Sequence, residues 1–175
     1  MKQTPLLLAL TGTFFSSTAH SASPLPAWQV TVFNTHSPAE RPGSDYSFFI
    51  RATISNPGSS SAPSTPASTA NCTVEWTYPA QPYGTGYACT TEEADAAWTL
   101  ELENPPGANY SSPTENVDAR FTLVVRGAEE ATTLSGTQHF EVGENLEGVC
   151  GGSGTCSWGL RDDSVPVLVE PTVIS

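Results

Sequence analysis

Hydrophobic and polar residues alternate along most of the chain with a period of two. Segment 98–103 (WTLELE) places Trp98, Leu100 and Leu102 on one side, with a threonine and two glutamates on the other. This alternation is typical of a β-strand with one buried face. It recurs in segments 28–33, 46–54, 72–78, 120–125, 133–142, 156–160 and 165–170.

Turn-forming residues separate these segments, and the chain has 15 prolines and 14 glycines. Helical periodicity is nearly absent. Many short strands with frequent turns predict an all-β fold, a single antiparallel β-barrel or sandwich of about eight to eleven strands. Segment 91–98 is the exception, because Thr91 in an N-cap position and the two glutamates after it predict one short helical turn.

Two longer segments interrupt the strand pattern. Segment 55–71 is rich in serine, threonine and proline, a composition that predicts a long solvated loop. We interpret it as a loop within one domain, because the two strands before it could not form a stable domain alone. Segment 103–118 predicts a second irregular loop. Residues 23–175 are therefore predicted to form a single β domain.

The first 22 residues have the pattern of a secretory signal peptide. Lys2 precedes an apolar run, and small residues follow that suit signal peptidase. Cleavage after Ala19, Ser21 or Ala22 fits the pattern equally well. No second apolar run approaches the length of a membrane helix. The sequence predicts a secreted, extracellular protein with no membrane partner.

The predicted mature chain is strongly acidic. Lys2 is the only lysine, so removal of the signal leaves five arginines against 18 acidic residues, a net charge of −13. A surface of this charge repels nucleic acid and anionic membranes. The acidic residues are scattered along the chain, which is typical of a solvated surface rather than of an acidic binding tail.

The chain contains four cysteines, and an even number in an exported domain predicts two disulfides. Three pairings are possible. We favour Cys72 with Cys89 and Cys150 with Cys156, because both are local. Loops of about 18 and about 7 residues correspond to roughly 3 and roughly 2.4 kcal/mol of stabilisation.

The late cysteine pair lies in the segment Val149–Cys156 (VCGGSGTC). A zinc site there would need two further ligands, and none follows at metal-ligand spacing. A redox centre would need closer cysteines at the start of a helix. The glycines at 151, 152 and 154 instead favour a tight loop with positive φ, closed by a structural disulfide.

The three histidines allow one metal hypothesis. If cleavage follows Ala19, His20 becomes the mature N-terminus and can bind copper through its amino group and ring. Copper-dependent polysaccharide oxygenases use such a terminus, and His36 or His139 could complete the site. Cleavage further along the chain removes this site. Otherwise the sequence predicts no cofactor.

Other catalytic patterns are weak. No nucleophile elbow is present. Glu101 and Glu103 share one strand face, as paired glycosidase carboxylates do, but the alternation favours a plain polar face. Three of the four tryptophans alternate with aliphatic neighbours and are predicted to be core residues rather than a sugar-binding platform. The four are Trp28, Trp76, Trp98 and Trp158. The chain is therefore predicted not to be an enzyme.

Two N-glycosylation sequons occur, at Asn71 (NCT) and Asn109 (NYS). Both are placed in predicted loops, where an exported eukaryotic protein tolerates a glycan. Asn71 and Asn109 are candidate glycosylation sites.

Three features together resemble the Alternaria major allergen family, which are small cysteine-stapled proteins secreted by fungi. They are WQVTVF followed by YSFFIRATIS, the cysteine pair between NCTVEW and GYACT, and the late pair in VCGGSGTC. The resemblance covers most of residues 27–165. It implies a single antiparallel β-barrel, the local disulfide pairing and no catalysis. It also implies an effector-like or allergen-like protein that engages host defence proteins or small phenolic ligands.

The chain departs from that family in two respects. The family prototype has an early cysteine that links two protomers, whereas this mature chain has none before Cys72. We therefore expect a monomer or a non-covalent dimer. The loop Ser55–Asn71 is also longer than the corresponding connection in the family.

The function expected from the sequence is that of a secreted, non-enzymatic fungal protein that binds an extracellular protein or a small molecule. Two alternatives stay open. One is an extracellular copper protein built on His20. The other is a structural protein of the cell wall or surface, suggested by the Ser/Thr/Pro-rich loop and the sequons.

Overall fold

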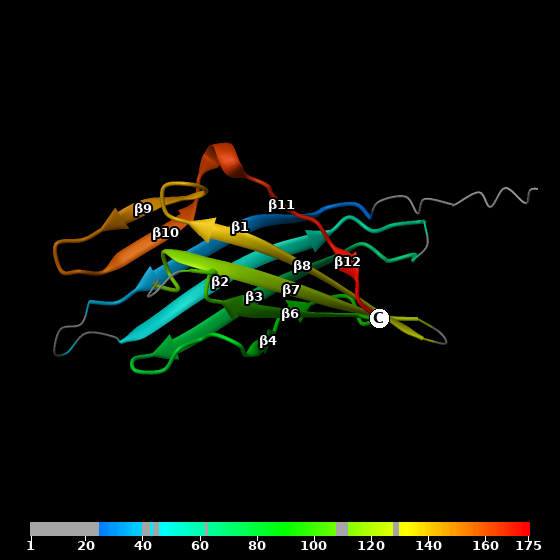
Figure 1. Cartoon of the computed structure of the whole chain (residues 1–175), viewed down its shortest axis with the longest axis horizontal. Coiled ribbons are helices and arrows are strands. Elements are labelled where there is room, and N and C mark those ends of the chain that lie inside the picture. Colours follow the sequence, from blue (N-terminus) through cyan, green and yellow to red (C-terminus); the bar gives the residue numbers. More distant parts are fainter. Residues whose placement is uncertain (1–24, 40–42, 44–45, 62, 108–111, 128–129) are drawn as a thin grey trace, which may run out of the picture.

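The computed structural model describes residues 25–39, 43, 46–61, 63–107, 112–127 and 130–175. These residues form two antiparallel sheets packed face to face (Figure 1). One sheet has seven strands in the order β5-β3-β2-β1-β10-β9, with β11 also paired to β1, and the other has five in the order β12-β8-β7-β6-β4. The all-β prediction is confirmed. The sheets are not closed into a barrel, so the architecture is the sandwich and not the barrel that the resemblance implied.

The seven-stranded sheet contains β1 (Trp28–Ser37), β2 (Ser47–Asn56), β3 (Ser68–Thr77), β5 (Thr90–Thr91), β9 (Leu146–Cys150), β10 (Cys156–Leu160) and β11 (Val167–Val169). The five-stranded sheet contains β4 (Gly86–Ala88), β6 (Ala96–Glu103), β7 (Asn116–Arg126), β8 (Ala131–Glu141) and β12 (Thr172–Val173). A 3-10 turn, η1 (Asp162–Ser164), follows β10.

The core lies between the sheets and follows the period of two. In β3, buried and exposed residues alternate without a break, and β6 and β7 show nearly the same pattern. Aromatic rings from the two sheets meet there. Trp28 contacts Trp98 edge to face at 4.7 Å between centroids, and Phe33 stacks on Phe140 at 3.7 Å. Trp28, Trp76 and Trp98 are all buried, which confirms their prediction as core residues.

The C-terminal segment joins the two sheets. β1 pairs with β11 over its first residues and with β10 over its last, and its register with β2 shifts between Val30 and Val32. After β11 the chain enters β12, which pairs with β8. Gly136 on β8 permits this crossing, because a Cβ there would lie 2.7 Å from Cγ1 of Val169. The end of the chain therefore belongs to both layers.

The predicted helical turn at 91–98 is wrong. β6 begins at Ala96 and pairs with β7, and the preceding residues form a turn. The Thr91 hydroxyl donates to the carboxylate of Glu93 and accepts a hydrogen bond from the Glu93 backbone N–H at 3.4 Å. Strand pairing thus outweighs the local capping preference.

The loop predicted at 55–71 is shorter and more ordered than expected. β2 continues to Asn56 and β3 begins at Ser68. Between them Ser59 and Thr65 form a β-bridge. The buried Asn56 side chain donates to the carbonyl of Pro66 at 2.9 Å. Polar groups of this loop therefore form hydrogen bonds with one another as well as with solvent.

Both favoured disulfides are present, Cys72–Cys89 and Cys150–Cys156. Cys72 lies on β3, whereas Cys89 lies between β4 and β5, where the chain passes from one sheet to the other. The second disulfide joins paired residues of β9 and β10. Of the three glycines in its loop, only Gly154 has a positive φ, at 90°, so the prediction of positive φ was wrong for residues 151 and 152.

Candidate functional site

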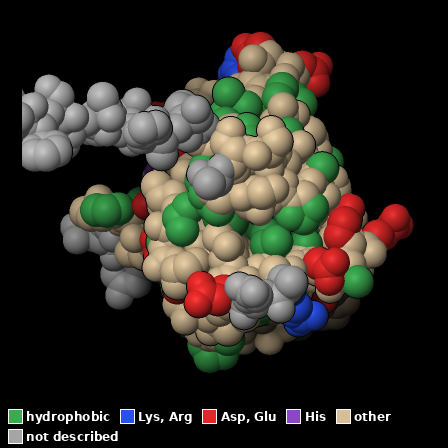
Figure 2. All heavy atoms as spheres, turned by 90° about the vertical axis from the view of Figure 1, so that its right-hand side faces the viewer, with side chains coloured by type: hydrophobic (Ala, Val, Ile, Leu, Met, Phe, Trp, Pro, Cys, Tyr) green, Lys and Arg blue, Asp and Glu red, His purple; other side chains and the backbone are tan. Residues whose placement is uncertain are grey.

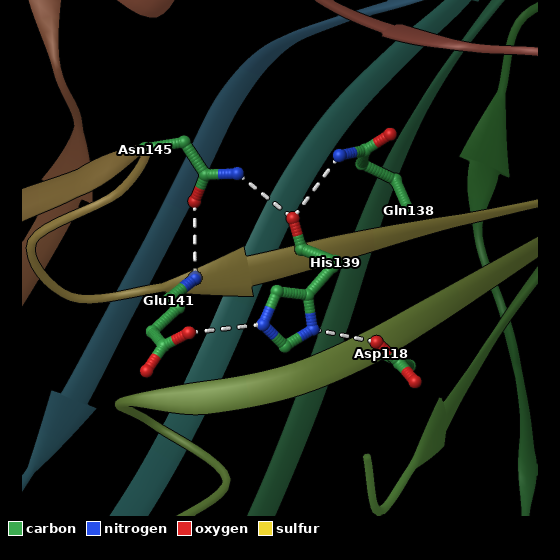
Figure 3. Close-up of polar contacts among 5 residues, drawn as sticks. All are labelled: Asp118, Gln138, His139, Glu141 and Asn145. Carbon is green, nitrogen blue, oxygen red and sulfur yellow. Dashed lines mark hydrogen bonds and ion pairs between the residues drawn. The ribbon is translucent and has the colours of Figure 1, made fainter. Parts of the chain in front are cut away.

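A cluster of ionisable side chains lies on the outer face of the five-stranded sheet, where β8 ends. His139 on β8 is the direct cross-strand partner of Asp118 on β7. Its Nδ1 lies 2.7 Å from Oδ1 of Asp118, and its Nε2 lies 3.2 Å from Oε2 of Glu141 (Figure 3). The ring is therefore held between two carboxylates, and about a third of its side-chain surface stays exposed (35%).

Asn145 fixes the turn that follows β8. Its side-chain oxygen accepts a hydrogen bond from the Glu141 N–H at 3.0 Å, and its amide nitrogen donates to the His139 carbonyl at 2.8 Å (Figure 3). Gly143 adopts the positive φ, 93°, that this turn requires. One asparagine thus holds the backbone of both His139 and Glu141 in place.

The surroundings of His139 raise its pKa above the ordinary value. Partial burial is the largest single effect and acts to lower the pKa, because it disfavours the imidazolium. The hydrogen bonds and negative charges of Asp118 and Glu141 together outweigh it. The imidazolium is the stabilised form in this cluster.

Arg120 occupies the next outward position on β7. Its Nη2 lies 3.2 Å from Oε1 of Glu101 and also contacts the carboxylate of Glu103. The two glutamates considered as a glycosidase pair therefore share one arginine on the outer face of β6. The predicted polar face of this strand is confirmed.

A third carboxylate lies near the imidazole. His139, Glu141 and Glu144 each offer one ligand atom, and these three atoms lie within 4.8 Å of one another. Glu144 belongs to the turn that Asn145 braces, and its side chain is exposed. The set combines one imidazole nitrogen with carboxylate oxygens, a donor set that suits divalent transition metals.

The outer face of the seven-stranded sheet carries a different feature, a shallow open hollow of about 380 Å³. It is lined by Asn34 and Thr35 of β1, Phe49 and Arg51 of β2, and Ser157, Trp158 and Gly159 of β10. We call it the β1 hollow. A Cβ at position 159 would lie only 2.9 Å from Oδ1 of Asn34, so glycine there leaves room for the asparagine.

Phe49 and Arg51 form one wall of the β1 hollow, and His36 packs against Phe49 from outside the lining. The guanidinium of Arg51 lies 4.4 Å from the centroid of the Phe49 ring, and the His36 ring stacks on Phe49 at 5.0 Å. His36 Nδ1 in turn lies 3.0 Å from the Ser157 hydroxyl. The ion pair between Arg51 and Glu75 is long, at 3.7 Å, and both side chains are exposed. The wall is therefore held mainly by stacking.

The structure separates the histidines considered for a copper site. His36 and His139 lie on the outer faces of different sheets, and side chains on opposite outer faces of a sandwich cannot meet. At most one of them could join an N-terminal histidine. His20 lies outside the described residues, so the copper hypothesis stays a prediction.

The two sequons differ in what the structure shows. Asn71 is exposed on the outer face of β3, and its Oδ1 accepts a hydrogen bond from the Thr53 hydroxyl at 2.8 Å. Its position is within a strand rather than in the predicted loop. Asn109 lies outside the described residues. Asn71 remains a candidate glycosylation site.

The surface shows no extended basic patch on the face in Figure 2, where acidic side chains outnumber basic ones around scattered hydrophobic groups. Within the described ranges, no helix is long and apolar enough to cross a membrane.

Comparison with known proteins identifies no relative: no family model, no curated protein and no solved structure matches the chain.

Sequence reasoning did not find either outer-face cluster. The segment HFEVGEN carried part of the signal, because His139 and Glu141 are two residues apart on one strand face and Glu144 follows in a turn. The contribution of Asp118 depends on the β7–β8 register, which the sequence pattern does not give. The β1 hollow likewise depends on the pairing of β1 with both β2 and β10.

Proposed function

We propose that the protein is a secreted, non-enzymatic binding protein whose ligand occupies the β1 hollow. The observation that carries the proposal is the composition of that hollow, which combines an aromatic wall with polar groups from Asn34, Arg51 and Ser157. Ligand sites typically join apolar surface with a few placed polar groups, in volumes of roughly 300–1,000 Å³. The β1 hollow is at the small end of that range.

The chemistry of the hollow favours a neutral, hydroxyl-rich ligand. The amide of Asn34 and the hydroxyl of Ser157 both donate and accept hydrogen bonds, and the Arg51 guanidinium offers donors in a fixed plane. The net charge of −13 predicted for the mature chain repels polyanions at long range. We therefore propose one or two sugar units of an extracellular polysaccharide as the ligand class.

An extracellular setting is supported by the two disulfides and by the signal-like N-terminus. A fungal source, and an effector-like or allergen-like role, rest on the sequence resemblance alone. A protein partner at the same face is the alternative form of this proposal, because Arg and aromatic side chains also mark protein interfaces.

The test is a pull-down of the mature, disulfide-intact protein with insoluble chitin, β-1,3-glucan, cellulose and xylan. We expect retention by at least one polysaccharide, and at least tenfold weaker binding for Arg51→Ala and for Asn34→Ala. Thr122→Ala is the matched control, because Thr122 lies on the outer face of the other sheet.

Absence of retention by all four polysaccharides contradicts the proposed ligand class, and equal binding by the Arg51 and Asn34 variants contradicts the proposed site. Recovery of the polysaccharide with unchanged chain length after incubation checks that the protein binds without cleaving. Shortened chains would overturn the non-enzymatic part of the proposal.

A further inference from the structure

The two ring nitrogens of His139 have different surroundings. Nδ1 lies 2.7 Å from Asp118, a partner on the neighbouring strand, whereas Nε2 faces Glu141 at 3.2 Å. When Nδ1–H donates to Asp118, the lone pair of Nε2 is directed toward Glu141 and the turn. Histidines that bind metals commonly have this arrangement, in which a carboxylate fixes the ring through the second nitrogen. Asp118 therefore orients His139 for a ligand on the Nε2 side.

The three donors lie almost close enough together to share a single ion. Metal–ligand bonds of about 2.1 Å bring two ligand atoms to at most about 4.2 Å apart. The ligand atoms of His139, Glu141 and Glu144 lie within 4.8 Å of one another. Glu144 is exposed and has room to move the small remaining distance. The braced backbone at Glu141 needs no change.

A separate observation concerns Asn116, the cross-strand partner of Glu141 on β7. The Oδ1 atom of Asn116 is buried and has no hydrogen-bond partner among the described residues. A buried acceptor without a partner is costly, and such atoms are usually satisfied by water or an ion. This unsatisfied oxygen belongs to the residue directly paired with Glu141, one of the three donors.

The negative charge around His139 also favours a bound cation. Asp118, Glu141 and Glu144 place three carboxylates around one imidazole, and Arg120 beside them is already shared by the two glutamates of β6. A divalent cation would relieve the mutual repulsion of these carboxylates. Among divalent ions, an imidazole ligand favours zinc, copper or nickel, whereas calcium and magnesium prefer oxygen ligands alone.

We propose that His139, Glu141 and Glu144 form a binding site for a divalent transition-metal ion, with Asp118 as the residue that orients the imidazole. The site uses no residue of the β1 hollow, and it is independent of an N-terminal histidine. Its place at the junction of β8 and β9 makes it a structural or accessory site at the point where the chain passes from the five-stranded to the seven-stranded sheet.

The test is isothermal titration of Zn²⁺ into the metal-free mature protein. We expect one ion per chain, at least tenfold weaker binding for His139→Gln and for Glu144→Gln, and weakening of roughly tenfold for Asp118→Asn. His36→Gln is the matched control and should bind as the wild type does, because His36 lies on the other sheet. Thermal unfolding with and without Zn²⁺ gives a second readout, since binding to the native state raises the melting temperature.

A fold check keeps the result interpretable. Each variant is compared with the wild type by urea unfolding in EDTA, and Glu144→Gln is the safest variant because its side chain is exposed. Saturable binding that is lost in His139→Gln and kept in His36→Gln supports the site. Absence of saturable Zn²⁺ binding, or equal binding by His139→Gln and wild type, overturns it.

Discussion

Polar side chains cover much of both outer faces of the sandwich, but different interactions hold these side chains in place. On the seven-stranded sheet, Arg51, Phe49 and His36 are stacked, and the nearest ion pair is long and exposed. On the five-stranded sheet, Arg120 and His139 are each placed between two carboxylates. Stacking depends little on salt or pH, whereas charge pairs depend on both.

This difference is the basis of the two binding sites that we propose, one on each face. The stacked face places hydrogen-bonding side chains around a hollow, which suits a neutral ligand. The charged face concentrates carboxylates around an imidazole, which suits a cation. The comparison also gives a means to test each face, because a change on one face should leave the other unaffected.

The largest effect is expected where both faces depend on one feature. The Cys72–Cys89 disulfide lies where the chain passes between the sheets. Cys72→Ala with Cys89→Ala should lower the free energy of unfolding by about 3 kcal/mol. Urea unfolding followed by tryptophan fluorescence measures the loss, and ligand and Zn²⁺ binding should weaken together.

The control for that prediction is Cys150→Ala with Cys156→Ala, which opens a shorter loop in an exposed hairpin. It should cost about 2.4 kcal/mol. If this pair proves the more destabilising, the longer loop and the inter-sheet position of Cys72–Cys89 do not make it the more stabilising disulfide.

A smaller effect distinguishes the faces directly. Arg120→Met leaves Glu101 and Glu103 without their shared cation, and we expect a loss of about 1 kcal/mol, since these groups are about one-third exposed. Arg51→Met should cost about 0.5 kcal/mol or less. Urea unfolding at low salt and in 1 M NaCl measures both variants. A larger loss for Arg51→Met, or a difference unchanged by salt, would argue against the contrast.

The smallest effect is a pH dependence confined to the charged face. The His139 pKa is raised in the folded state, so its stabilisation is fully present below the unfolded value of about 6.5 and is lost as pH rises through the folded pKa. We expect a decline of under about 1 kcal/mol, because the side chain is partly exposed. The measurement is urea unfolding of the metal-free protein in EDTA between pH 5.5 and about 8.5.

His139→Gln should remove this decline, and His36→Gln should retain it. A decline of equal size in His139→Gln would assign the pH dependence to other groups. Asp118→Asn provides a further comparison, because it removes one of the two carboxylates that raise the pKa.

The sequence pattern predicted the core better than the surfaces. Alternation identified Trp28, Trp76 and Trp98 as buried, because a period of two is sufficient to assign residues to a face. Locality was sufficient for both cysteine pairs. The helical turn at 91–98 failed because pairing of Ala96 with Val125 extends β6 backwards over residues with helical preference.

The sequence pattern could not predict the candidate sites, for a different reason. Asp118 and His139 are 21 residues apart and meet only through the β7–β8 register. Asn34 lies between β2 and β10, which are far apart along the chain. A site assembled across strands depends on the topology, and alternation alone does not determine which strands become neighbours.

The edge-to-face contact of Trp28 and Trp98 joins the two sheets, since one ring comes from β1 and the other from β6. Two indoles at 4.7 Å and 68° couple their electronic transitions, so the folded protein should show an exciton couplet in its far-ultraviolet circular dichroism. Loss of the couplet with retention of the β-sheet signal would reveal a state in which the layers have separated before the strands unfold. The circular dichroism of this tryptophan pair therefore reports directly whether the two sheets are packed against each other.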